Sequence, residues 1–406
     1  MKKILDYIDS GENIIIDLQK GLTSRPAINP ENGGNGEYEK FLYLKEYIEK
    51  IGFDKIEEEF APDERVSDKI RPSLIATING ENNSKNLWII SHTDVVPPGE
   101  LKLWDTDPYT ATVKNGKIYG RGTEDNQQSI VSSILAARAL IENKVKPFYT
   151  VKLLFVADEE VGSEYGIQWF LKNRNYFSKD DIIIIPDGGD SKGSTIEIAE
   201  KSILWINFKL FGKQSHGSRP DLGINTARAS SHLCVRMESL NKIFSEKDGM
   251  YDIPYSTFEP TKRSNAITNM NTIPGEENLS FDCRILPLYN LEDIKNEINE
   301  IKKSVEDDFG VKIETEYVQN IQAPPPTSET SEVVELLKKS IKKIMNIDAS
   351  PIGIGGGTVA AYFRMEGYST AIWSTIDSTM HSPNEYSKIS NTINDAKVFA
   401  NLMTGA

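Results

Sequence analysis

Short apolar runs of strand length alternate with segments of helical periodicity through the first half of the chain. Leu87–Ile90, Val151–Val156 and Ile182–Ile185 are runs typical of buried strands. Segments 38–51 and 130–141 instead repeat apolar residues at helical spacing. This alternation predicts an α/β domain with a mostly parallel central sheet and helices on both faces. Ligands of such sheets bind outside the carboxyl ends of the strands.

The pattern changes near Glu200. Segments 203–210 and 279–285 alternate apolar and polar residues, as half-exposed antiparallel strands do. Helices are expected over 225–242 and 291–305, and a further strand over 311–318. We therefore predict a small α+β domain, residues 202–319, inserted into a larger domain made of residues 1–201 and 320–406. The Ala323–Pro326 segment is a stiff polyproline connector between them.

Charge and composition exclude several classes of partner. The net charge of −14 over 406 residues argues against nucleic acid and against an anionic membrane surface. No apolar stretch approaches the roughly 20 residues of a membrane helix. Acidic residues interrupt the N-terminal segment, so no signal peptide is expected there. The two cysteines, Cys234 and Cys283, fall in apolar periodic segments and are interpreted as core residues, which favours a cytoplasmic location.

Two adjacent acidic residues, Glu159 and Glu160, follow the run that ends at Val156. Neighbouring carboxylates at a strand end repel one another, and each raises the pKa of the other. A metal ion removes this cost. One carboxylate then binds the metal, and the other is free to act as a base.

Four further segments carry residues with metal-ligand chemistry, and each also has an ordinary interpretation. His92 closes a predicted strand, and Asp94 shares its face, so that Asp94 can hydrogen-bond the imidazole; the pair could equally cap a strand end. Asp125 precedes a predicted helix, where it could be an N-cap. Asp187 ends a buried run, as in many turns. His381 lies in a loop, where most histidines are exposed to solvent.

Together these residues form a set that single motifs do not. Two imidazoles and three carboxylates, with one carboxylate bridging, make a two-zinc site with open positions for water. Glu159 remains as general base and then general acid. The predicted metal ligands are His92, Asp125, Glu160, Asp187 and His381.

With these motifs in this order, the chain resembles the two-zinc superfamily of aminoacylases, carboxypeptidase G, acetylornithine deacetylases and succinyl-diaminopimelate desuccinylases. The resemblance runs from about Leu87 to His381. It implies a zinc-peptidase-like catalytic domain with an inserted lid domain that forms a homodimer. It also implies that Asp125 bridges two ions, one completed by His92 and Asp187 and the other by Glu160 and His381. Asp94 would then orient His92, and Glu159 would activate the bridging water.

The inserted domain carries two further motifs of this superfamily. The segment 213–220 resembles the lid motif whose histidine, here His216, reaches the scissile carbonyl, often from the partner subunit, and stabilises the oxyanion. The segment 271–275 and Arg284 resemble a second lid motif, which implies that Asn271 and Arg284 contact substrate; a surface salt bridge is an equal interpretation of Arg284. The loop with Gly357 and Thr358 resembles the glycine-rich loop beside the substrate carboxylate.

Two departures bear on specificity. Asp125 is followed by Asn126-Gln127-Gln128, where many relatives have Lys-Gly or a similar pair. Position 187 is Asp, as in the dipeptidase and aminopeptidase branch, whereas the deacetylases and desuccinylases usually carry Glu. The methylene lost at this ligand affects the choice of metal. Zinc is expected, and carboxylate-rich sites also accept cobalt or manganese.

The sequence thus predicts a metal-dependent hydrolase that cleaves the amide bond of a peptide, a dipeptide or an N-acyl amino acid. An acetylornithine deacetylase or a succinyl-diaminopimelate desuccinylase is the alternative within this class. Two other classes stay open: an iron oxygenase with a facial triad of His92, Asp94 and His381, and a non-catalytic binding protein on the same scaffold. The α/β pattern and the retained Glu159 count against them.

Overall fold

The computed structural model describes residues 1–405, which divide into two compact units. The first unit contains residues 1–198, 327–351 and the chain from Thr358 onward; the second contains residues 199–326 and 352–357. The second unit is longer than the inserted domain predicted at 202–319. The polyproline connector belongs to the second unit, and so does the short segment 352–357, which no local pattern distinguishes.

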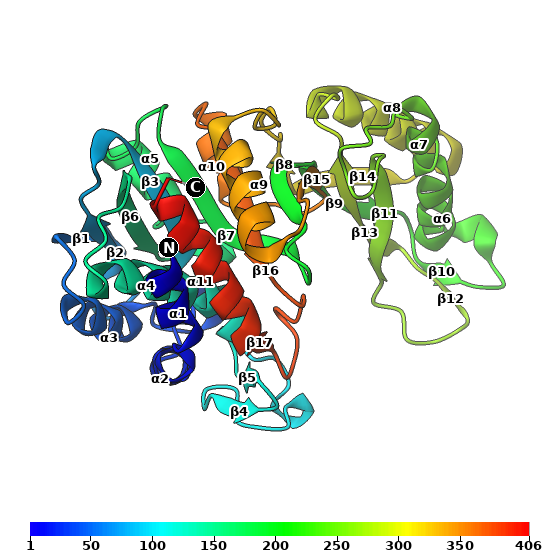
Figure 1. The fold of residues 1–406 in the computed structure, drawn as a ribbon. Helices are drawn as coiled ribbons and strands as arrows, with labels where there is room; N and C mark the ends of the chain where they lie inside the picture. The colour runs from blue at the N-terminus through cyan, green and yellow to red at the C-terminus, as the bar shows by residue number, and fades with distance from the viewer. Residues whose placement is uncertain (406) are drawn as a thin grey trace. The chain divides into compact units, whose positions relative to one another are not determined.

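A central eight-stranded sheet forms the core of the first unit (Figure 1). Its four middle strands run parallel, whereas β1, β2 and β8 pair antiparallel to their neighbours. This confirms the predicted α/β class with a mostly parallel sheet. In spatial order the strands are β1 (Lys55–Pro62), β2 (Ile70–Ile78), β6 (Tyr149–Val156), β3 (Asn82–His92), β7 (Ile182–Asp190), β16 (Thr370–Thr375), β8 (Thr195–Glu200) and β15 (Ser350–Ile354).

Helices cover both faces of this sheet (Figure 1). The helices α1 (Lys2–Asp9), α2 (Glu12–Thr23), α4 (Gln128–Glu142), α9 (Glu332–Met345) and α11 (Ile389–Met403) pack against one another in one layer. On the other face, α5 (Ile167–Asn173) and α10 (Ala360–Met365) bury an apolar cluster around Trp88. Helix α3 (Tyr38–Glu49) packs on β2. A small sheet of β17 (Tyr386–Lys388), β5 (Lys117–Tyr119) and β4 (Thr112–Lys114) completes the unit.

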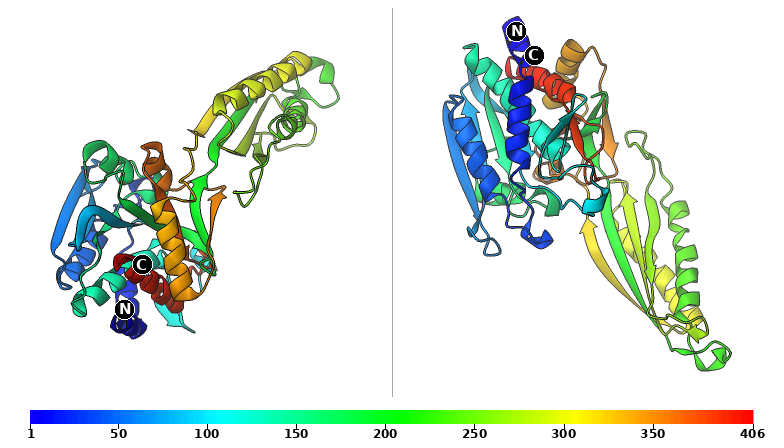
Figure 2. Two further views of the ribbon diagram at one scale, coloured as in Figure 1. Left: turned by 45° about the horizontal axis from the view of Figure 1, so that its top comes forward. Right: turned by 90° about the horizontal axis from the view of Figure 1, so that it is seen from below.

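The second unit is a four-stranded antiparallel sheet with helices on one face (Figure 2). Its strands are, in spatial order, β11 (Thr257–Ser264), β13 (Glu276–Ile285), β9 (Ser202–Phe211) and β14 (Lys312–Ile321). Its helices are α6 (Thr226–Met237), α7 (Leu240–Ile243) and α8 (Leu291–Phe309). The alternating side chains of β9 and β13 are buried against α6 and α8, as their pattern predicts.

Two elements of the second unit differ from expectation. The helix expected over 225–242 is broken after Met237, where the Ser239 hydroxyl donates to the carbonyl of Arg236. Strand β11 was not predicted, because most of its residues are exposed and Pro260 interrupts it with a register shift. A separate pair of short strands, β10 (Ser215–His216) and β12 (Thr272–Ile273), lies beyond the main sheet. Among the described residues, no helix combines the length and apolar character that a membrane span requires.

Candidate metal centre

The five predicted metal ligands come from five separate segments that meet at the carboxyl edge of the central sheet. His92 is the last residue of β3, and Asp187 lies in the second half of β7. Glu160 is in the short turn Glu159–Val161 that follows β6. Asp125 is in the distorted turn Thr123–Gln127 before α4, and His381 is in the loop between β16 and β17. Parallel strands therefore bring together residues that are far apart in the chain.

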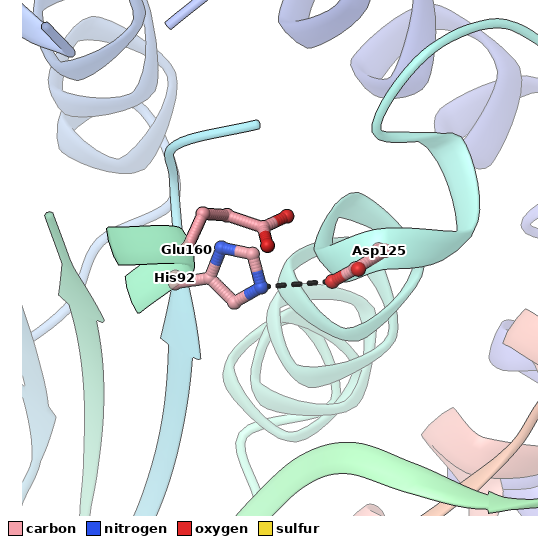
Figure 3. A group of neighbouring side chains, drawn as sticks. All are labelled: His92, Asp125 and Glu160. Carbon is pink, nitrogen blue, oxygen red and sulfur yellow. Dashed lines mark hydrogen bonds and ion pairs between the residues drawn. The ribbon is translucent and has the colours of Figure 1, made fainter. Parts of the chain in front are cut away.

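Asp125 stands at the centre of this cluster. Its Oδ1 lies 2.9 Å from His92 Nε2, and its Oδ2 lies 3.2 Å from His381 Nε2 (Figure 3 shows the first of these contacts). Asp187 Oδ1 is 3.5 Å from the same His92 nitrogen. Glu160 Oε2 is 3.1 Å from His381 Nε2. Each oxygen of Asp125 thus faces a different imidazole, and each imidazole has a second carboxylate beside it.

Glu159 also belongs to this cluster. One ligand atom from each of His92, Glu159 and Asp187 lies within 4.8 Å of the others, and the same holds for His92, Asp125 and Glu160. The two adjacent glutamates therefore belong to two different groups of potential ligand atoms. Glu160 is placed beside Asp125, and Glu159 beside Asp187.

Asp94 holds both His92 and the two glutamates. The His92 Nδ1 is 3.1 Å from the backbone carbonyl of Asp94 and 3.4 Å from its carboxylate. The carboxylate itself accepts the backbone N–H groups of Glu159 and Glu160, each at 3.0 Å, and the side-chain amide of Asn29 at 2.8 Å. Asp94 thus fixes the turn that carries the two glutamates as well as the ring orientation of His92.

Sequence reasoning missed a buried ionic network behind Asp94. Arg71 is fully buried and hydrogen-bonds both Asn29 and Glu37, and its Nη1 lies 3.0 Å from Asp158 Oδ1. Asn29 connects Arg71 to Asp94. Burial raises the pKa of Glu37 to about 7 despite its bond to Arg71. Asn29, Glu37 and Arg71 lie in segments with no motif, so only their burial reveals them.

The departure at positions 126–128 has structural consequences. Asp125 is not an N-cap, because α4 begins at Gln128 and Gln127 occupies the cap position without a side-chain bond. The Asn126 side chain donates to Asp187 Oδ1 at 2.7 Å and to the Pro186 carbonyl at 2.9 Å. Asn126, in the turn before α4, therefore orients a predicted metal ligand on strand β7.

The pKa values of the cluster show that its negative charge needs compensation. Burial, and next the charge of Asp187, raise the pKa of Glu159 well above its usual range. Burial and Asp125 raise the pKa of Glu160 to about 7. Hydrogen bonds to Asp125 and Glu160 raise the pKa of His381 to about 10. Protons supply positive charge to these groups, and bound divalent cations would do the same.

His216 and Asn271 belong to the second unit and are exposed. Strand pairing places His216 opposite Thr272, and the Gly217 N–H donates to the Asn271 carbonyl at 2.7 Å. The two predicted lid motifs thus form one local structure. The Ser218 N–H donates to His216 Nδ1 at 3.1 Å, so the neutral ring carries its proton on Nε2 and can donate it.

Arg284 forms a salt bridge, the second of its two predicted roles. Its Nε and Nη2 reach the two oxygens of Asp282 at 2.7 and 3.0 Å. Its Nη1 donates to the Gly355 carbonyl at 3.0 Å, in the loop that continues to Gly357. Gly357 is the last residue of the second unit, and Thr358 begins the following segment of the first.

Comparisons with known proteins place the chain in a family of peptidases. The sequence model of peptidase family M20/M25/M40 matches residues 88–405. An uncharacterized metallohydrolase of Methanocaldococcus jannaschii is 42% identical over 96% of this chain and 98% of its own. A succinyl-diaminopimelate desuccinylase of Nautilia profundicola is 28% identical over 91% of this chain and 93% of its own. The crystal structure of aminopeptidase PepT from Bacillus cereus superposes with a TM-score of 0.76 at 19% identity, covering 97% of this chain and 98% of that one.

Proposed function

Because the chain belongs to peptidase family M20/M25/M40 and is a metallohydrolase acting on peptide or amide bonds, we propose that its cluster holds two divalent metal ions bridged by Asp125. The observation that carries this proposal is the pair of contacts from the two oxygens of Asp125 to His92 and His381. In the proposal, His92 and Asp187 are the other ligands of one metal ion, and Glu160 and His381 are the other ligands of the second.

The donor set suits such ions. Two imidazoles and three carboxylates give the mixed nitrogen and oxygen ligands of zinc, and cobalt or manganese are alternatives. The contacting atoms already lie 2.9 to 3.5 Å apart. Metal ions in this cluster would polarise the scissile carbonyl and acidify a water molecule.

Glu159 is the proposed general base. It lies with His92 and Asp187 among the potential ligand atoms, and its turn is fixed by Asp94. It would take the proton of the attacking water and deliver it to the leaving nitrogen. Burial raises the pKa of Glu159, and this direction favours the protonated form that the second step requires.

The residues of the second unit are proposed to bind substrate. His216, with its proton on Nε2, would donate to the developing oxyanion. Asn271 is tied to the same local structure and would contact substrate beside it. Asp282 already occupies the fork of Arg284, so we assign Arg284 to holding the Gly355–Gly357 loop. The backbone of Gly357 and Thr358 would then meet a substrate carboxylate.

The substrate is proposed to be a peptide, a dipeptide or an N-acyl amino acid. The name of the Bacillus cereus neighbour favours a peptide, and that of the Nautilia relative favours a succinylated amine. Asp187 in place of Glu supports the peptide class. Acetylornithine deacetylase or desuccinylase activity is the alternative that the same site would support.

A homodimer through the second unit is part of the proposal. Strand β11 is an edge of its sheet and most of its residues are exposed. A hollow of about 910 Å³ lies beside it, lined by residues that include Cys234, Val235 and Phe258. The Val235 side chain, 63% exposed, is an apolar contact for a partner.

Both thiols are free, in keeping with the proposed cytoplasmic location.

The test combines metal analysis with a substrate panel. The purified protein is stripped with a chelator, reconstituted with zinc or cobalt, and assayed on dipeptides, N-acetyl-ornithine, N-succinyl-diaminopimelate and long-chain N-acyl amino acids. We expect about two metals per chain and hydrolysis of one class of amide, lost on chelation and regained with metal. A single metal per chain, or hydrolysis that is indifferent to chelation, would contradict the two-metal proposal.

A further inference from the structure

Glu385 carries a carboxylate that does not belong to the cluster but holds the segment around Asp125. It is fully buried. Its Oε1 accepts the backbone N–H groups of Glu124 at 3.0 Å and of Asp125 at 3.1 Å. Its Oε2 accepts the Gly122 N–H at 3.0 Å and Arg121 Nη1 at 2.6 Å. Glu385 therefore reaches from the loop of His381 into the turn that carries the proposed bridging ligand.

Glu124 makes the reverse connection, from the turn of Asp125 to the loop of His381. Its side chain is 3% exposed and points into the loop that leads to His381. Its Oε1 accepts the Asp377 N–H at 2.6 Å. Its Oε2 accepts the Thr379 hydroxyl at 2.7 Å, the Thr379 N–H, and the Met380 N–H at 3.1 Å. Each ligand-bearing loop thus sends one carboxylate to the backbone amides of the other.

This arrangement needs a cause beyond the connection of the two loops. The loops are already joined where β17 pairs with β5, and the Gly120 N–H donates to the Glu385 carbonyl. Burying a carboxylate is costly, and burial raises the pKa of both glutamates. The donors that compensate this cost are concentrated on the residues next to Asp125 and His381. The two carboxylates therefore restrict the positions of these two side chains in particular.

We propose that Glu124 and Glu385 are a reciprocal pair of positioning residues that fix Asp125 relative to His381. In this way they set the metal affinity of the site formed by Asp125, His381 and Glu160. This inference rests on the proposed two-metal function and deepens it. Groups that orient metal ligands without touching the metal contribute about 10- to 100-fold in metal affinity. The metal site of His92 and Asp187 does not include His381, so its affinity should depend less on Glu124 and Glu385.

The test measures zinc affinity in the full chain by competition with a chromophoric chelator. The variants are Glu124→Gln and Glu385→Gln, which keep the side-chain shape but turn one acceptor into a donor. We expect each variant to lower the affinity for one of the two zinc ions by about 10- to 100-fold and to leave the affinity for the other within a few-fold of that of the unmodified chain. The double variant should lose less than the product of the two single effects, because both act on one pair of loops.

Asp181→Asn is the matched control. Asp181 is also a buried carboxylate with several N–H donors, namely Asn86, Trp88 and Ser178, but it lies at the amino end of β7, away from the ligands. This variant should unfold more easily and bind both zinc ions as the unmodified chain does. An equal loss of zinc affinity in Asp181→Asn would overturn the proposal, since general destabilisation would then explain the effect.

Two further outcomes are decisive. Folded glutamine variants with unchanged zinc affinities would overturn the positioning role and leave the two-metal proposal intact. If the unmodified chain binds fewer than two zinc ions, the two-metal proposal itself fails before any variant is compared. Should the glutamine variants not fold, Thr379→Val removes a single hydroxyl donor to Glu124. An unchanged zinc affinity in that variant would also overturn the proposal.

Discussion

The metal cluster of the first unit and the His216 region of the second are held in contrasting ways. Around the cluster, Asp94 and Glu385 are fully buried and bind backbone groups from distant segments. Around His216, the side chains are exposed: Ser218, two residues away, hydrogen-bonds the His216 ring, and the pairing of β10 with β12 places His216 opposite Thr272. One region is fixed by buried carboxylates that bind several segments, and the other by an exposed turn and one pair of short strands.

The difference follows from the cost of burying charge. A buried carboxylate must receive several hydrogen bonds or a cation, and these come from whichever segments the fold brings near. An exposed histidine has water as a partner and needs no such network. We infer that the cluster is organised before substrate binds, whereas the His216 region gains its remaining contacts from substrate or a partner subunit.

The largest expected effect comes from breaking the first region at its proposed base. Glu159→Gln should lower kcat by at least about 1,000-fold, because amide oxygen cannot take the proton of the attacking water. Metal content, measured by elemental analysis, should not change, since Glu159 is not a proposed ligand. Glu164→Gln, at an exposed glutamate five residues away, is the control and should keep full activity. Normal turnover in Glu159→Gln would rule out the base assignment.

The second region predicts a smaller loss. His216→Ala should lower kcat by about 100- to 1,000-fold through loss of one oxyanion donor, with metal content and KM little altered. His232→Ala is the matched control in the same unit, because His232 packs against Phe309 with ring centroids 4.6 Å apart. Equal activity losses in the two variants would remove His216 from the chemistry.

The same variants test whether His216 acts across a dimer. Hybrid dimers of Glu159→Gln and His216→Ala subunits should recover part of the activity, because one of their two sites has both residues intact. Recovery is measured after mixing the inactive variants and verifying hybrid formation by mass. Hybrids without activity would place His216 in the site of its own subunit.

The smallest predicted effect concerns pH and the metal-free protein. Burial raises the pKa values of Glu160, Glu385 and Asp395 to about 7, and all three lie in the first unit. The folded chain therefore binds protons that the unfolded chain releases near pH 4 to 5, and the stability they contribute is lost as pH rises through about 7. His381, with a pKa raised to about 10, acts in the same direction above about pH 6.5.

The free energy of unfolding of the metal-free first unit should therefore fall between pH 5.5 and 8. Urea unfolding followed by tryptophan fluorescence in a Trp205→Phe variant measures this, since the remaining tryptophans lie in the first unit. Metal binding needs ionised ligands and should reduce the fall. A metal-free stability that rises over this range would contradict the pKa assignments.

Much of the first unit could be predicted because its strands are short buried runs followed by the residues of interest. The resemblance drawn from these motifs is confirmed by the family match over residues 88–405. Strand β11 was not predicted because it is an exposed edge strand that contains Pro260 and has no apolar alternation. Glu124 and Glu385 escaped as functional residues because a buried glutamate is indistinguishable in sequence from an exposed one.

The sequence alone determined which chemical groups are present, their order, and their placement after buried strands, because local periodicity reports the faces and ends of elements. Only the tertiary structure decided which oxygen of Asp125 faces which imidazole, that Arg284 is engaged by Asp282, and that Glu124 and Glu385 exchange partners. Arg121 and Glu385 are 264 positions apart in the chain. No local pattern encodes such a contact, since it depends on how the buried strands and loops pack together.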